Sequence, residues 1–126
     1  MRRILTDMLV AAIFALPVFI YKIFNPSGAD TPWMLILTLL LISPVAEEMF
    51  FRGVLLELTL RQNIRQLLGN IAVSVVFAAV HVLVRQEPAA AAVFFPSVIL
   101  GWLYCRHRRV IPVIVIHSFY NIVVLI

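Results

Sequence analysis

Six polar side chains stand inside apolar stretches of the sequence, where charges and hydrogen-bonding groups are costly to place. They are Glu47, Glu48, Arg52, His81, His117 and Asn121. An ionisable side chain at membrane depth costs roughly 2.5 to 3.5 kcal/mol on insertion scales, so several together need partners or a function. A carboxylate can act as a general base, whereas histidine and asparagine can position water, bind a metal ion or stabilise an oxyanion.

Helical spacing separates the two adjacent acids. Glu48 and Arg52 are four residues apart and share a helix face, so they can form an ion pair that lowers the cost of both charges. Glu47 is rotated about 100° from Glu48, so the partner of one is not automatically the partner of the other. A purely structural ion pair that holds helices together is the simpler interpretation of Glu48 and Arg52.

The remaining polar residues form two similar pairs. His117 and Asn121 are four residues apart and project from one helix face. Phe77 stands one turn before His81, where its ring can pack against the imidazole and fix it. Taken singly, His81 could be an interior histidine with satisfied hydrogen bonds, and Asn121 a contact between helices.

The elements that carry these residues are predicted to be membrane helices. The chain has 126 residues, is 63% hydrophobic and 13% charged, and has a mean hydropathy of +1.07. Soluble domains are about half apolar and roughly a quarter charged, so a water-soluble globule is excluded, as are the disordered and fibrous classes. The single cysteine, Cys105, excludes an internal disulfide.

Five apolar runs predict an all-α polytopic membrane protein, because a bilayer needs about 20 mostly apolar residues per helix. We expect a single integral-membrane domain over residues 1–126, with the motif-bearing core at about 33–126. A long first run favours a retained helix over a cleaved signal peptide. The runs extend from about Ile4 to Phe24, Trp33 to about Leu58, about Leu67 to Val84, Ala89 to Cys105 and Val110 to Ile126.

The basic residues predict the orientation of these helices. Seven Lys and Arg residues fall at the N-terminus and in alternate connections, against two on the opposite side. The positive-inside rule then places the N-terminus in the cytoplasm and the C-terminus outside a cell (plasma) membrane. The basic residues form no stripe with interleaved aromatics, which argues against nucleic acid as a partner. Asp7, Glu57 and His107, near helix ends, are expected at the membrane interface.

Depth along the helices brings the polar residues to one level. Counted from the predicted cytoplasmic ends at 1.5 Å per residue, Glu47, His81, His117 and Asn121 lie roughly 10 to 17 Å deep. This is near the middle of a hydrocarbon core about 30 Å thick. We therefore expect three helices to surround one polar intramembrane cavity.

Three motifs occur in order on separate predicted helices: Glu-Glu-x-x-x-Arg at 47–52, Phe-x-x-x-His at 77–81 and His-x-x-x-Asn at 117–121. Together they resemble the motifs of the CAAX-processing and bacteriocin-processing intramembrane proteases. This family is also called the type II CAAX prenyl endopeptidase or lysostaphin-resistance-protein-like group. The resemblance covers about residues 43–121 and implies hydrolysis of a peptide bond inside or at the edge of the membrane.

The resemblance also implies roles for individual residues. Glu47 would be the general base that activates water, and His81 would share in positioning that water. His117 and Asn121 would complete the site, by binding metal or by stabilising the oxyanion. Supporting residues would be Glu48, Arg52 and Phe77.

The cofactor is left open between zinc and no metal. Glu47, His81 and His117 could form a site of two histidines and one carboxylate with an open position for water. The sequence has no His-Glu-x-x-His, so such a site would differ from that of an ordinary zincin. If Glu47 bound the metal, Glu48 would have to serve as the base.

Two other classes of function are alternatives to an intramembrane endopeptidase. The first is a non-catalytic membrane scaffold or bacteriocin self-immunity protein that keeps the polar cluster for structure. The second is a small transporter that uses Glu47 and the histidines as a proton relay. It is the more distant alternative, because the spans show no paired halves. The expected partners are the lipid bilayer and a peptide or prenylated protein substrate. The family generally has more helices, and assembly into a homo-oligomer is one way in which a short chain could complete the fold.

Overall fold

The computed structural model describes residues 2–13 and 33–125, and in these ranges the chain is helical with short connections and no strand. The predicted all-α fold class is therefore confirmed. The elements in chain order are α1 (Arg2–Ile13), α3 (Trp33–Leu37), the π-helix η1 (Thr38–Ile42), α4 (Ser43–Phe50), the π-helix η2 (Phe51–Leu56), α5 (Glu57–Arg61), α6 (Gln66–Arg85), the 3-10 helix η3 (Pro88–Val93), α7 (Phe94–His107) and α8 (Val110–Leu125).

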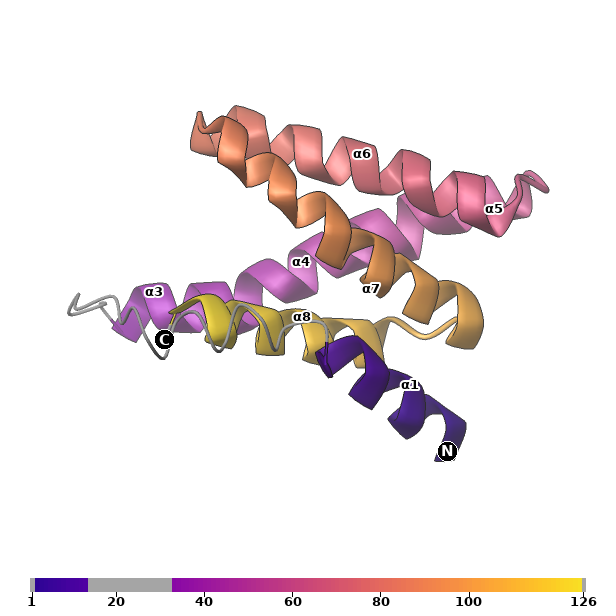
Figure 1. Ribbon diagram of the computed structural model, residues 1–126, viewed down its shortest axis with the longest axis horizontal. Helices are drawn as coiled ribbons and strands as arrows, with labels where there is room; N and C mark the ends of the chain where they lie inside the picture. The colour runs from indigo at the N-terminus through magenta and orange to yellow at the C-terminus, as the bar shows by residue number, and fades with distance from the viewer. Residues whose placement is uncertain (1, 14–32, 126) are drawn as a thin grey trace.

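The segment from α3 to α5 is one continuous helical rod that contains two wide π turns (Figure 1). The residues at its internal junctions all have right-handed helical backbone angles. Pro44 accounts for the first π turn, because proline has no N–H to donate and its ring clashes with the carbonyl four residues earlier. In η1 the turn widens, and the Ser43 N–H bonds the carbonyl of Thr38 instead.

The other helices pack around this rod in two groups. One group is a hairpin of α6 and α7, joined through η3, which contacts the rod at η2. In the other group, α8 lies along α4 and η1, and α1 packs against α7 and α8 (Figure 1). The rod therefore contacts both α6 and α8, while α7 packs against both of these helices, so segments far apart in the sequence meet at its middle.

Within residues 2–13 and 33–125, two helical segments are long and apolar enough to cross a membrane by length and composition. They are Gln66–Arg85, which is α6, and Pro88–His107, which joins η3 and α7, whereas Val110–Leu125 is apolar but shorter. The second predicted run is divided by the two π turns, and the end of the first predicted run lies outside the described residues. The predicted count of five spans is therefore not confirmed.

Large apolar side chains cover the outside of the helices. Leu83, Val84 and Ile111, for example, are 68%, 77% and 75% exposed. In water, a continuous surface of this kind marks an interaction site or an aggregation hazard. In a bilayer it lies against lipid tails that are as apolar as the side chains themselves. The helix surfaces are therefore compatible with the membrane environment that the composition predicts.

Asp7, expected near the membrane interface, is enclosed by protein. It is 7% exposed because α1 packs against α7. Its Oδ2 lies 2.5 Å from Arg106 Nε and 2.7 Å from His107 Nε2. His107, for which the sequence also predicts an interfacial position, has a side chain only 14% exposed. Pairing offsets part of the cost of burying the Asp7 carboxylate, and it fixes α1 to the end of α7.

Gly101 allows α6 and α7 to approach closely. A Cβ atom at this position would lie 1.8 Å from Asn70 Oδ1. The Asn70 side chain is 5% exposed, and its Nδ2 donates to the carbonyl of Val98 at 2.9 Å. Because this amide bridges the two helices, it cannot move aside without losing that hydrogen bond.

Gly101→Ala is expected to destabilise the protein by about 1 to 3 kcal/mol, the usual cost of overpacking a core. Gly53→Ala is the matched control, because a Cβ there meets nothing closer than Val110 Cγ2 at 3.8 Å. Thermal unfolding in detergent, followed by circular dichroism, measures both variants. Equal unfolding midpoints would contradict the close contact between Gly101 and Asn70.

Candidate active site

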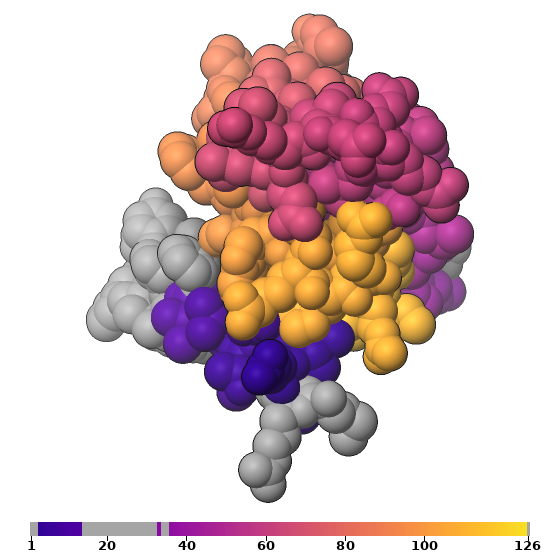
Figure 2. Space-filling view, turned by 90° about the vertical axis from the view of Figure 1, so that its right-hand side faces the viewer, coloured from indigo at the N-terminus to yellow at the C-terminus, as the bar shows by residue number. Residues whose placement is uncertain are grey.

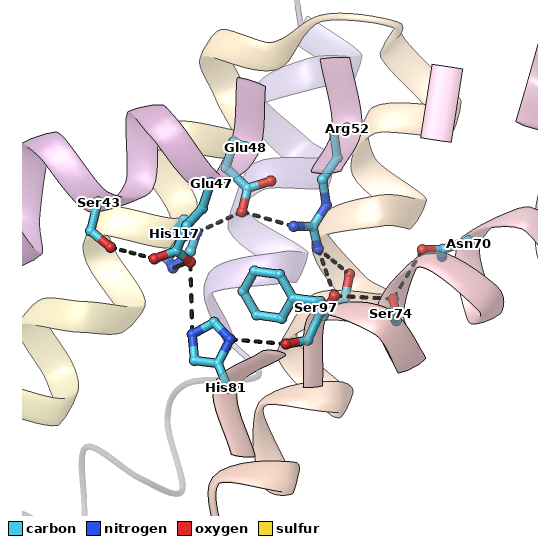
Figure 3. Close-up of polar contacts among 10 residues, drawn as sticks. Ser43, Glu47, Glu48, Arg52, Asn70, Ser74, His81, Ser97 and His117 are labelled. Atoms are coloured by element: carbon cyan, nitrogen blue, oxygen red, sulfur yellow. Dashed lines mark hydrogen bonds and ion pairs between the residues drawn. The ribbon is translucent and has the colours of Figure 1, made fainter. Parts of the chain in front are cut away.

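The two acids of α4 lie at the middle of the rod and meet different partners (Figure 3). Glu48 is 0% exposed, whereas the side chain of Glu47 is 24% exposed. The difference follows from the rotation of about 100° between successive helical residues. One carboxylate is therefore enclosed by protein, and the other remains accessible.

Glu48 connects the rod to α8. Its Oε1 accepts a hydrogen bond from Arg52 Nη1 at 3.0 Å, which is the ion pair that the spacing of four residues predicts. The same oxygen lies 2.6 Å from His117 Nδ1. Arg52 is itself 0% exposed, so this is a buried pair whose charges depend on each other.

Glu47 faces two histidines from two other helices. Its Oε1 accepts a hydrogen bond from Ser43, one turn earlier in α4. Its Oε2 is 3.8 Å from His81 Nε2 on α6 and 3.8 Å from His117 Nε2 on α8, and it is buried without a hydrogen-bond partner. Separations of this size are too long for direct hydrogen bonds and suit a bridging water.

The tautomers of the two histidines are set by the groups that face Nδ1. His81 Nδ1 is 3.0 Å from the carbonyl of Phe77, which can only accept, so Nδ1 carries a proton. His117 Nδ1 faces the carboxylate of Glu48 in the same way. In each neutral imidazole the lone pair is then on Nε2, the atom nearest Glu47. Three acceptor atoms converge, and a proton, a water or a cation is needed between them.

Arg52 extends the polar contacts into the α6–α7 hairpin. Its Nη2 donates to the carbonyl of Ser97 at 2.9 Å and to Ser97 Oγ at 2.7 Å. Ser97 Oγ donates to Ser74 Oγ at 3.1 Å, and Ser74 Oγ donates to Asn70 Oδ1 at 3.4 Å. This buried chain of hydrogen bonds connects the rod, α6 and α7 behind Glu48 (Figure 3).

Phe77 separates His81 and His117 from this chain of hydrogen bonds. Its ring centroid is 4.3 Å from that of His81 and 6.1 Å from that of His117. The Arg52 guanidinium carbon lies 5.0 Å from the same centroid, within cation–π range. Phe77 thus supports both imidazoles and shields Arg52.

Asn121 lies on α8 one turn after His117, and its Nδ2 donates to the carbonyl of Leu39 in η1 at 2.7 Å. This carbonyl belongs to the π turn, where the backbone bonding pattern is altered. The amide therefore fixes α8 against the rod. It has a second N–H that this bond does not use.

The structure brings Glu47, Glu48, His81 and His117 together and places Arg52 and Phe77 directly behind them. Sequence reasoning missed the serines. Ser43 precedes Glu47 by four residues, a spacing that could have revealed the contact, as could that of Ser74 and Asn70. No local pattern marks Ser97, because its partner Arg52 is 45 residues away.

Zinc prefers donors of the kinds found on Glu47, His81 and His117. Two ligands of a tetrahedral zinc ion lie roughly 3.4 Å apart for bonds of about 2.1 Å, and the separations from Glu47 Oε2 are 3.8 Å. Within residues 2–13 and 33–125, no group of three or more His, Cys, Asp or Glu side chains is arranged to hold a metal ion. We therefore assign no catalytic step to a metal.

An all-helical chain with membrane-compatible surfaces and a carboxylate between two histidines defines the class of helical membrane proteins with a polar internal site. The family model of the type II CAAX prenyl endopeptidase Rce1-like proteins matches residues 29–123, and the chain belongs to this family. Membership makes it an integral membrane protein and indicates a function of the CAAX protease type. Searches of curated proteins and of solved structures gave no match.

Proposed function

We propose that this chain is an intramembrane endopeptidase that hydrolyses a peptide bond of a membrane-associated or prenylated peptide. The observation that carries the proposal is the position of Glu47 Oε2, 3.8 Å from the Nε2 atoms of both His81 and His117. Three groups from three helices thereby lie at separations that one bridging water molecule can span. Membership of the Rce1-like family supports the same reaction.

Water activation is the role of Glu47 and His81. A water between them donates one hydrogen bond to Glu47 Oε2 and the other to the Nε2 lone pair of His81, which leaves an oxygen lone pair for the substrate carbonyl carbon. As the C–O bond forms, Glu47 takes its proton and the carbonyl π electrons move to the carbonyl oxygen. Glu47 is thus the general base, and His81 orients the nucleophile.

Oxyanion stabilisation is the role of His117 and Asn121. In the form of His117 that carries hydrogen on both ring nitrogens, Nδ1 donates to Glu48 and Nε2 can donate to the oxyanion. Glu48 is the positioning residue for His117, as the buried aspartate is for the histidine of a serine protease triad. Asn121 contributes its second amide N–H.

The reaction ends with a return of the proton. Collapse of the tetrahedral intermediate breaks the C–N bond, and Glu47 gives its proton to the leaving amine nitrogen. The new carboxyl group releases the remaining proton of the water, so one water is consumed and a carboxylate and an amine are formed. Glu47 thus acts first as base and then as acid.

The buried chain of hydrogen bonds favours one second candidate, a non-catalytic membrane scaffold or bacteriocin self-immunity protein. Arg52, Ser97 and Ser74 are each 0% exposed and bond one another across three helices. Such a network stabilises a helix assembly whether or not a substrate is bound. In this alternative, the accessible Glu47 could be replaced without loss of any cellular phenotype.

Cleavage of a lipid-tethered peptide library by the purified full chain tests the proposal, with product termini identified by mass spectrometry. We expect cleavage by the wild type and an unchanged rate in the presence of a zinc-chelating phenanthroline, because protein groups carry every proposed step. The non-chelating phenanthroline isomer is the control. Inhibition that zinc reverses would contradict these steps and make Glu47, His81 and His117 zinc ligands. No cleavage of any peptide would favour the scaffold.

A further inference from the structure

A basic pocket lies at the arginine-rich end of the molecule, away from the site of Glu47. Its volume is about 660 Å³, and it is lined by Arg3 and Ile4 of α1, by Arg106 and His107 of α7, and by Arg109. Figure 2 looks onto this end, where the indigo α1 lies against the orange and yellow atoms of the α7–α8 region. The only acid that contacts this lining among the described residues, Asp7, is paired with both Arg106 and His107.

The charge of this pocket suits a phosphate group. Arg3 and Arg109 are exposed, and three guanidinium groups against one carboxylate leave an excess of positive charge. Arg109 directly precedes α8, whose first turn has free amide groups and the positive end of the helix dipole. Arginine binds phosphate oxygens through paired N–H groups.

An apolar groove of about 600 Å³ lies between α6 and α7, and Val10 of α1 lines one part of it. Its α7 side includes Ile99, Trp102 and Cys105, and its α6 side is formed by Gln66, Leu67 and Asn70. Most of the exposed lining is hydrocarbon, so the groove suits an acyl chain.

The basic pocket and the apolar groove lie on the same faces of both helices. Arg3 and Val10 are seven residues apart on α1, and Trp102 and Arg106 are four apart on α7, so each pair shares one face. The Arg106 guanidinium carbon is 5.7 Å from the centroid of the Trp102 ring, which joins the two regions directly. A basic pocket with room for a phosphate headgroup thus adjoins an apolar groove through the contact between Arg106 and Trp102.

We propose that the basic pocket and the apolar groove together bind one anionic phospholipid, with the phosphate in the pocket of Arg3, Arg106 and Arg109 and an acyl chain in the groove beside Trp102. Basic pockets between membrane helices are the usual sites for anionic headgroups. The lipid would hold α1 against α7, at the ends where the two helices are joined by Asp7.

Quenching of Trp102 by brominated lipids tests this proposal. A Trp33→Phe background leaves Trp102 as the only tryptophan of the two in the chain. The full chain is reconstituted with phosphatidylglycerol or phosphatidylcholine brominated in the acyl chains. We expect phosphatidylglycerol to quench at a several-fold lower mole fraction. Equal quenching by the two lipids would overturn the proposal, whatever the behaviour of further variants.

Charge-removing variants then distinguish specific lipid binding in the basic pocket from nonspecific attraction by surface charge. Arg3→Gln with Arg109→Gln should abolish the several-fold preference for phosphatidylglycerol, because each arginine near an anionic surface contributes up to about five-fold. Arg61→Gln with Arg65→Gln removes two charges from the same end and should leave the preference unchanged. Equal losses in both double variants would overturn the proposal. So would removal of the preference by millimolar inorganic phosphate, because the pocket would then be a site for free phosphate.

Discussion

Glu47→Gln is expected to lower kcat and kcat/KM together by about 10²- to 10⁴-fold, the usual contribution of a general base. The substitution keeps the volume of the side chain and the hydrogen bond from Ser43, but the amide cannot take a proton from water. An interaction made chiefly in the transition state changes both constants by the same factor, so KM should change little. Steady-state cleavage of a defined peptide, selected from the library, measures both constants.

Two further variants make this prediction specific. Asn121→Ala should lose less, about 10²- to 10³-fold, as expected for one oxyanion donor. Glu87→Gln is the matched control, because Glu87 is an exposed acid in the connection between α6 and η3. If Glu47→Gln cleaves at the wild-type rate, Glu47 is not the base and the scaffold function is favoured.

Arg52→Ala is expected to destabilise the protein by about 3 to 5 kcal/mol, because it leaves a buried carboxylate without its cation. Glu48 would retain only His117, and Ser97 would lose two hydrogen bonds. Glu47→Ala should cost less, since Glu47 is partly exposed and its Oε2 has no hydrogen-bond partner. The unfolding midpoint in detergent and the accumulated amount in membranes measure the difference.

The chain contains its own control for this prediction. Arg61 and Glu57 form an ion pair at 3.1 Å with the same spacing of four residues, but the Arg61 side chain is 73% exposed. An exposed pair contributes about 0.2 to 1 kcal/mol, so Arg61→Ala should be nearly neutral. Similar effects of Arg52→Ala and Arg61→Ala would show that burial of the Glu48–Arg52 pair has little energetic weight.

Local spacing predicts much of the candidate site. The ion pair of Glu48 and Arg52 and the packing of Phe77 on His81 are contacts across one helical turn, and both are present. The common depth of Glu47, His81 and His117 also leads to their proximity, since antiparallel helices in a bilayer share one depth scale. These inferences need only the rise and rotation of a helix.

Contacts between helices could not be predicted in the same way. The bond from Asn121 to the carbonyl of Leu39 depends on the side-by-side packing of α8 and η1. The pairing of Asp7 with His107 depends on α1 lying against α7, which places together residues 100 positions apart. The number of membrane spans is equally hard to predict from hydropathy. A hydropathy averaged over a window does not reveal the π turns that divide the rod or the charged side chains inside it.

The π turns also decide which changes of length the rod tolerates. A π turn is equivalent to an α-helix with one residue inserted, and each inserted residue rotates the rest of the helix by about 100°. The π turn η1 precedes α4, and the π turn η2 follows it. The directions in which the α4 side chains point therefore do not depend on the helical register of α3 and α5. A one-residue deletion in Thr38–Ile42 would be absorbed as the π turn tightens towards an α-helical turn, whereas a deletion inside α4 would turn Glu47 away from both histidines.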